Sequence, residues 1–359
     1  MPDDEKVLER FRHAQESLVL QMADLSLRTI SDMVADEAID IAPHYQRRER
    51  WSIEKQSALI ESFLLNVPVP PVYLSEDEYG VYSVIDGKQR ITAIHKFLTG
   101  EFALKDLYEL PELGGRTFER LPAELRRTLT VRPYLRVVTL LKQSDPELKY
   151  EVFRRLNTGG ERLEQQEVRN VVFRGKLNDL IYKLAEEPFL KQQLKIYNTK
   201  SAAYVDMTDA EYVLRFLTLR VNWSKFSGSL ARSMDDFMAK KENQSPTALQ
   251  LFENRFRTAL HACEEIWGDN AFRRPADERS WRDQTLAGMY DAQMVAVDSL
   301  SHEERENAKT NATRIVDLTR TRFFDDKQFE KSVRIATNTP SSVRYRVQQF
   351  QRILRVDES

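Results

Sequence analysis

Hydrophobic positions in the first part of the chain change their period several times. Residues 5–20 predict a helix, and the spacing of Ile30, Met33 and Val34 predicts a second one. Ser52 fits the N-cap position of a third helix, because a serine hydroxyl can accept a hydrogen bond from a backbone amide of the first turn. This part of the chain therefore contains helices interrupted by other structure.

Short strands are predicted between these helices, because several stretches are rich in β-branched and aromatic residues. The stretches are residues 39–42, 70–76, 79–86 and 130–141. An acidic turn joins the second stretch to the third. An amphipathic helix is predicted after residue 86, and it closes at Gly100. Residues 114–128 are expected to be a polar linker.

The strand pattern fades after residue 145. A helix, a Thr-Gly-Gly turn and a second helix are predicted first, and helical periods then continue over residues 178–355. The predicted fold class is α+β, with a small mixed α/β domain over residues 1–145 and an all-α helical domain over residues 146–359.

Composition limits the classes of function. The formal net charge is −2, so any binding of nucleic acid must come from a local basic patch. Cys263 is the one cysteine, which excludes a disulfide framework and a multi-cysteine zinc site. Neither a secretory leader nor a long apolar run is seen, so we expect a cytoplasmic protein with no membrane partner.

One strand-to-helix corner combines a carboxylate, a glycine and two cations. Its residues are Asp86, Gly87, Lys88, Gln89 and Arg90. A helix N-terminus favours an anion, and glycine lets the backbone approach a ligand closely. Lys88 and Arg90 can add charged donors to phosphate oxygens. The residues alone leave a second interpretation open, in which Asp86 caps the helix and the cations are solvated.

Two other segments carry candidate binding residues. The helix–turn–helix segment offers backbone amides and polar side chains, and an aromatic–arginine loop precedes Trp51. Their candidate residues are Arg155, Asn157, Thr158, Gly159, Gly160, Glu167, Arg169 and Asn170 in the first segment, and Tyr45, Gln46 and Arg47 in the second. A glycine C-cap between two core helices, and a loop anchored on the core, are the alternative interpretations.

Taken in order, four stretches resemble a known family. PHYQRRERWS, LLNVPVPPVYL, VIDGKQRITAIHKFLTGEF and VFRRLNTGGERLEQQEVRN are similar to the ParB/sulfiredoxin-like N-terminal domain of GmrSD-type (type IV) restriction proteins. The resemblance covers roughly residues 25–200. The family usually has DGQQR where this chain has DGKQR, so Lys88 replaces a glutamine.

The resemblance implies a nucleotide-binding and nucleotide-hydrolysing regulatory domain in bacterial defence against foreign DNA. In that interpretation Asp86, Lys88 and Arg90 bind an NTP and act on it, with Mg²⁺ as a candidate companion ion. The other candidate residues of the corner, the aromatic–arginine loop and the helix–turn–helix segment complete the pocket.

The same resemblance implies a partner. Complete GmrSD-type enzymes join this domain to an HNH-like nuclease domain. Here His261 and His302 are the only histidines after His95, and neither lies in a paired motif. We therefore expect the nuclease or effector to be a separately encoded protein, while a homo-oligomer stays open.

Two alternatives remain. Asp77, Asp86 and Lys88 have the spacing of a D…(D/E)xK magnesium nuclease, although Gly87 interrupts the strand there. The chain is alternatively a non-enzymatic DNA-binding, ParB-like adaptor. In that case Arg344, Arg346 and Arg352 of the last helix would contact phosphates.

Overall fold

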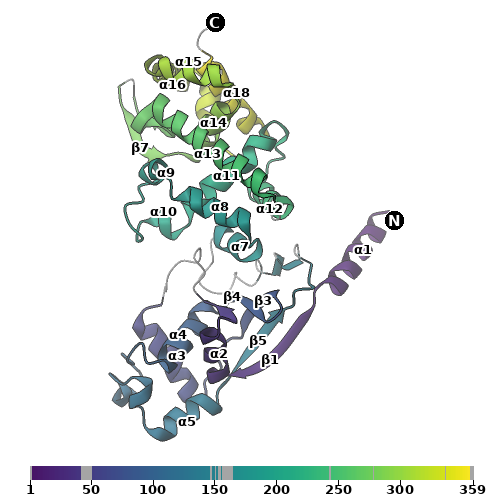
Figure 1. Ribbon diagram of the computed structural model, residues 1–359, viewed down its shortest axis with the longest axis vertical. Coiled ribbons are helices and arrows are strands. Elements are labelled where there is room, and N and C mark those ends of the chain that lie inside the picture. Colours follow the sequence, from purple (N-terminus) through teal and green to yellow (C-terminus); the bar gives the residue numbers. More distant parts are fainter. Residues whose placement is uncertain are drawn as a thin grey trace. The chain divides into compact units, whose positions relative to one another are not determined.

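The computed structural model describes most of the chain, which divides into two compact units. The described residues are 2–41, 51–145, 148–149, 151–152, 155, 165–241, 244–277, 279–335 and 337–355. Unit 1 comprises residues 1–163 and 170–172, and unit 2 comprises residues 164–169 and 173–359. Figure 1 shows the sheet of unit 1 and the helices of unit 2. The predicted α+β class is confirmed.

Unit 1 is built on a five-stranded mixed sheet. Its strands are β1 (Leu20–Ser26), β2 (Ile39–Asp40), β3 (Val72–Glu78), β4 (Val81–Asp86) and β5 (Tyr134–Leu140), in the spatial order β1-β5-β3-β4-β2. The β1–β5 and β3–β4 pairs are antiparallel, whereas β5–β3 and β4–β2 are parallel. β3 and β4 are therefore interior strands, and the predicted DGKQR corner begins at the last residue of β4.

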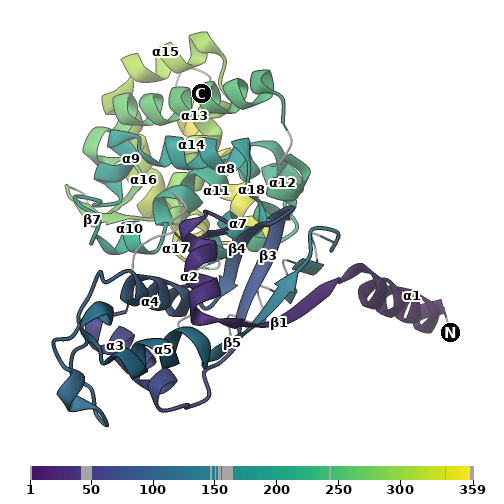
Figure 2. The same ribbon diagram turned by 60° about the horizontal axis from the view of Figure 1, so that its bottom comes forward.

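The helices of unit 1 are α1 (Pro2–Ser17), α2 (Leu27–Ala35), α3 (Ile53–Leu64), α4 (Lys88–Leu98) and α5 (Ala123–Val131), with 3-10 turns at Pro111–Leu113 and Phe118–Arg120. Ser52 caps α3 as predicted, since its Oγ accepts a hydrogen bond from the Lys55 amide at 3.4 Å. α2, α3, α4 and α5 contact one another, and Figures 1 and 2 show them together on one side of the sheet.

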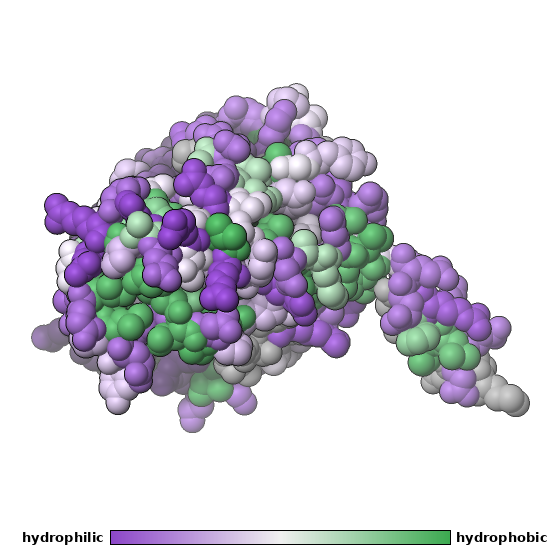
Figure 3. All heavy atoms as spheres, turned by 90° about the horizontal axis from the view of Figure 1, so that it is seen from below, coloured by the Kyte–Doolittle hydropathy of each residue, from purple (hydrophilic) through white to green (hydrophobic). Residues whose placement is uncertain are grey.

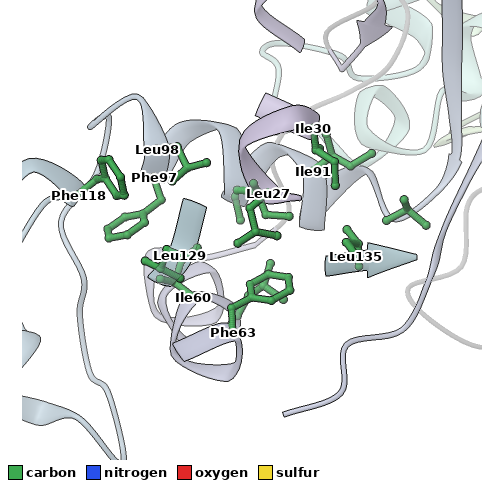
Figure 4. Packing of buried hydrophobic residues seen from close by; sticks show 14 of the residues in the cluster. Leu27, Ile30, Ile60, Phe63, Ile91, Phe97, Leu98, Phe118, Leu129 and Leu135 are labelled. Atoms are coloured by element: carbon green, nitrogen blue, oxygen red, sulfur yellow. The ribbon is translucent and has the colours of Figure 1, made fainter. Parts of the chain in front are cut away.

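The core of unit 1 lies between this helical layer and the sheet. Leu27, Ile60 and Ile91 are buried residues of α2, α3 and α4. Figure 4 shows them with Leu135 of β5 and with the ring of Phe97. Burial of such side chains stabilises the fold by about 1.5–3 kcal/mol each. The buried residues of α4 therefore hold this helix, and with it the corner before it, against the sheet.

One face of α1 is apolar and exposed. Val7, Leu8 and Phe11 are 63%, 52% and 59% exposed. Figure 3 shows hydrophobic side chains on this helix among hydrophilic ones. Their spacing places them on one side of the helix.

Unit 2 is largely helical. Its helices are α7 (Gln165–Val172), α8 (Lys176–Ala185), α9 (Pro188–Gln193), α10 (Ala202–Val205), α11 (Thr208–Asn222), α12 (Leu230–Lys241), α13 (Pro246–Trp267), α14 (Ala287–Asp298), α15 (His302–Thr310), α16 (Ala312–Asp325), α17 (Lys327–Arg334) and α18 (Pro340–Leu354). α14 is the central helix, because every residue from Gly288 to Val297 is buried and α11, α13 and α18 pack against it.

Three elements differ from the sequence-based expectation. Unit 2 is not all-α, because β6 (Arg273–Pro275) and β7 (Trp281–Thr285) form an antiparallel hairpin. The predicted linker overlaps α5, which begins at Ala123 and runs on to Val131, and the first helix ends at Ser17 instead of reaching residue 20. Among the described residues, no helix is long and apolar enough to cross a membrane.

Candidate functional site

The candidate site is the corner where β4 passes into α4. β4 ends at Asp86, Gly87 occupies the N-cap position with φ +94°, and α4 begins at Lys88. A Cβ built on Gly87 would lie 2.4 Å from Cγ1 of Val72. Glycine is thus required here for two reasons, the left-handed backbone and the closeness of β3.

Arg90 ties the corner together. Its Nη2 donates to Oδ2 of Asp86 at 2.7 Å and to the Pro71 carbonyl at 3.2 Å. The Arg90 side chain is 14% exposed, whereas that of Asp86 is 39% exposed. Arg90 therefore links the start of β3 to the end of β4, and the half-exposed carboxylate faces solvent. No sequence pattern indicates the part played by Pro71, because its contribution is a backbone carbonyl.

The N-terminus of α4 presents backbone amides. The first intrahelical hydrogen bond runs from the Ile91 amide to the Gly87 carbonyl at 3.0 Å, so the amides before it point out of the helix. Gly87 has no side chain to cap them. An α-helix of this length carries a partial positive charge at this end. The corner thus combines helix amides with the side chains of Lys88 and Arg90, which suits an anion.

Gln89 connects the corner to the segment that precedes α3. Its Oε1 accepts a hydrogen bond from the Trp51 amide at 3.4 Å, and the Trp51 carbonyl accepts one from Nε2 of Gln56 at 3.1 Å. Trp51 is close in sequence to the candidate residues Tyr45, Gln46 and Arg47. Those three lie outside the described residues, and so do Asn157, Thr158, Gly159, Gly160 and the side chain of Glu167.

The candidate residues of the second segment that are described have other partners. Nε of Arg155 donates to Oε1 of Glu151 at 2.7 Å, and the Arg155 side chain is 77% exposed. Arg169 is fully buried, and its Nε donates to Oδ1 of Asp235 at 2.7 Å. Asn170 is also fully buried. Arg169 thus holds α7 to α12, and the described contacts of its guanidinium lie within unit 2.

The carboxylates of the nuclease alternative lie apart. In the β3–β4 pair Tyr73 faces Asp86, and Asp77 lies four residues further along β3. At about 3.3 Å per residue, the two aspartates are separated by roughly 13 Å. Oδ1 of Asp77 accepts a hydrogen bond from Ser83 at 3.1 Å. No group of three or more His, Cys, Asp or Glu side chains able to hold a metal is found among the described residues.

The three arginines predicted to bind DNA have different environments. Arg346 is fully buried, and its Nη2 donates to Oδ2 of Asp291 at 2.8 Å. The expectation that Arg346 contacts DNA is therefore corrected, because a buried guanidinium does not reach phosphates. Arg344 is half-buried. Arg352 is exposed and lines a groove that also contains Asp325 and Asp326.

Comparison with known proteins adds one finding. Curated proteins and solved structures gave no match to this chain. Residues 30–174 match the family model described as the GmrSD restriction endonuclease, N-terminal domain. The match includes the corner and all of α7, and it indicates a role in a restriction system. Residues 30–174 therefore belong to the N-terminal domain family of GmrSD restriction endonucleases.

Proposed function

We propose that unit 1 binds a nucleoside triphosphate at the β4–α4 corner and regulates a DNA restriction system. The observation that carries the proposal is the juxtaposition at Gly87. A left-handed glycine brings the end of β4 and the amide-bearing start of α4 together beside Arg90, whose side chain is 14% exposed. Phosphate groups bind readily at such helix termini.

Different groups of the corner would contact different parts of the triphosphate. The α4 amides and Lys88 bind phosphate oxygens, and Lys88 is the candidate contact for the terminal phosphate. Asp86 fixes the guanidinium of Arg90 at 2.7 Å, so that this charge needs little reorganisation when the ligand arrives. Where Mg²⁺ accompanies the nucleotide, the exposed edge of Asp86 is an oxygen ligand of the type Mg²⁺ prefers.

The domain family supports the proposed regulatory role. The matched domain is described as part of a restriction endonuclease, and the described carboxylates do not form a nuclease metal site at the corner. We therefore infer that a separate nuclease or effector protein cuts the DNA. Nucleotide binding and hydrolysis would control that partner.

Calorimetric titration of the full chain with ATP and GTP, each with Mg²⁺, tests the proposal. We expect binding by the wild type and at least a tenfold weaker affinity in Arg90→Ala, because a charge-assisted contact contributes about 1.5–3 kcal/mol. Phosphate release measured in the same samples distinguishes hydrolysis from binding alone.

Arg126→Ala is the matched control, since Arg126 is a unit 1 arginine whose Nη1 pairs with Glu119 at 3.2 Å away from the corner. It should bind nucleotide like the wild type. Absence of binding by the wild type at millimolar nucleotide would remove the proposed function. Equal losses in both arginine variants would remove the assignment to the corner.

A further inference from the structure

Within the described part of the chain, the β6–β7 hairpin of unit 2 carries arginines without counter-ions. Arg274, Arg279 and Arg282 have no hydrogen-bond or ion-pair partner for their side chains among the described residues. Arg273 differs, because its Nη2 pairs with Oδ1 of Asp283 at 3.2 Å. Figures 1 and 2 show β7 at the edge of the helical unit. The hairpin thus presents an excess of positive charge.

Like charges are gathered here although they repel one another. Burial is the largest cause that lowers the pKa of Arg274, and the neighbouring charges of Arg282 and Arg334 lower it further. Glu330 is the carboxylate that opposes them, but it is already ion-paired with Arg334 of the same helix. The charge of Arg334 is thereby compensated within α17, and the charges without a described carboxylate partner are those of the hairpin itself.

Asp277 accepts several hydrogen bonds within the hairpin. Oδ1 of Asp277 accepts hydrogen bonds from the amides of Arg279 and Ser280 at 2.8 and 2.9 Å, and its Oδ2 accepts one from the Ser280 hydroxyl at 2.6 Å. These bonds lower the pKa of Asp277. Asp283 is likewise engaged, since Nζ of Lys195 donates to its Oδ2 at 2.7 Å. Both described carboxylates of the hairpin therefore serve the fold, and neither neutralises the three arginines.

An aromatic ring contacts the helical layer at the turn end of the hairpin. The guanidinium carbon of Arg320 lies 5.8 Å from the ring centroid of Trp281, within the range of a cation–π interaction. Arg320 comes from α16, which contacts β6. The arginines thus lie on a short β-hairpin that packs against α16.

We propose that the β6–β7 hairpin contacts the phosphate backbone of duplex DNA. A polyanion is the ligand that offsets the charges of Arg274, Arg279 and Arg282, which have no carboxylate partner among the described residues, and phosphate oxygens accept the donors of guanidinium groups. DNA is chosen among polyanions because of the restriction role, so in this respect the inference rests on the proposed function. It replaces the expectation that the last helix contacts DNA.

The test uses the full chain and a fluorescently labelled DNA duplex of about 25 base pairs, with binding followed by anisotropy over a range of salt concentrations. Each phosphate contact contributes about 0.9 to the slope of log affinity against log salt. Arg274→Gln with Arg282→Gln should weaken binding about tenfold at 0.1 M salt and lower the slope by about 1.8. The double variant should unfold no earlier than the wild type, because it removes repulsion.

The matched control is Arg344→Gln with Arg352→Gln, which removes the same charge from α18. This variant should keep most of the wild-type affinity. Equal losses in the two double variants, or a larger loss in α18, would overturn the proposal, as would a wild type that does not bind DNA. The hairpin variant should still bind nucleotide and Arg90→Ala should still bind DNA, so this proposal and the proposed function can fail separately.

Discussion

Gly87 couples backbone conformation to packing at one position. Its φ of +94° belongs to the left-handed region, and Val72 of the neighbouring strand occupies the space that a side chain would need. A residue with a Cβ would have to push β3 away from the corner or rebuild the start of α4. The geometry of the candidate site thus depends on a missing side chain as much as on the charged ones.

Gly87→Ala should lower the free energy of unfolding by about 2–4 kcal/mol, combining left-handed strain with an overpacked contact. Urea unfolding followed by circular dichroism measures the change. Gly100→Ala is the control, because Gly100 has a φ of +80° but nothing lies within 4 Å of the position that an alanine methyl group would take. It should lose only about 1 kcal/mol. A similar loss at both positions would mean that the Val72 contact is unimportant.

The candidate corner could be predicted because its charged residues are neighbours in the sequence. The partners of other arginines could not be predicted. Asp86 ends β4 and Arg90 lies in the first turn of α4, so their contact spans a single local corner of the chain. Arg169 and Asp235 are 66 residues apart, and Arg346 and Asp291 are 55 apart. Such pairs depend on tertiary packing, which is why the surface role predicted for Arg346 is wrong.

At the scale of elements, prediction succeeded where one face of the element is buried. β3, β4 and α4 bury hydrophobic positions and lie where the sequence predicts them, although both strands begin two residues later than expected. β1 was missed because it is an edge strand whose first three residues are exposed. The β6–β7 hairpin was missed for a related reason: its strands are short, and the exposed positions of β7 are the polar residues Arg282, Asp283 and Gln284.

α3 also holds a long loop in place through one carboxylate. Oε1 of Glu61 accepts hydrogen bonds from the amides of Glu109 and Leu110 at 2.8 and 2.9 Å, and Oε2 accepts one from the Tyr108 amide at 3.2 Å. Glu61 is buried, while Tyr108 is 88% exposed. The backbone of the loop is thus held by a buried side chain, while the ring of Tyr108 faces solvent.

Glu61→Ala should cost about 1–3 kcal/mol, because three amides lose their acceptor. Limited digestion with chymotrypsin should cut after Tyr108 faster than in the wild type. Glu61→Gln keeps an oxygen acceptor and should restore most of the protection. Unchanged digestion in Glu61→Ala would show that the loop is held by its other contacts.

At the scale of the whole molecule, the two units have separate cores. The polar centre of unit 2 is Asp291, which accepts hydrogen bonds from Arg215 at 3.0 and 2.7 Å and from Arg346 at 2.8 Å. Asp291 and Arg346 are fully buried. Removing this carboxylate would leave two guanidinium groups in the interior with too little opposing charge.

Asp291→Ala should therefore destabilise unit 2 by about 3–5 kcal/mol and leave unit 1 folded. Scanning calorimetry should show one transition moving to lower temperature while the other stays, and nucleotide affinity measured below the first transition should be unchanged. Asp24→Ala, which removes an exposed carboxylate paired with Arg136, should move neither transition noticeably. A single transition that shifts as a whole in Asp291→Ala would show that the units unfold together.

The arginines of the β6–β7 hairpin have a consequence for protein engineering. A screen that selects only for resistance to heat would favour the loss of Arg274 or Arg282, since each replacement relieves repulsion in the unliganded chain. The same replacements would remove the contacts proposed for DNA. Stability and activity would then be selected in opposite directions at these positions, so a thermostable variant of this protein should be checked at the hairpin before it is used.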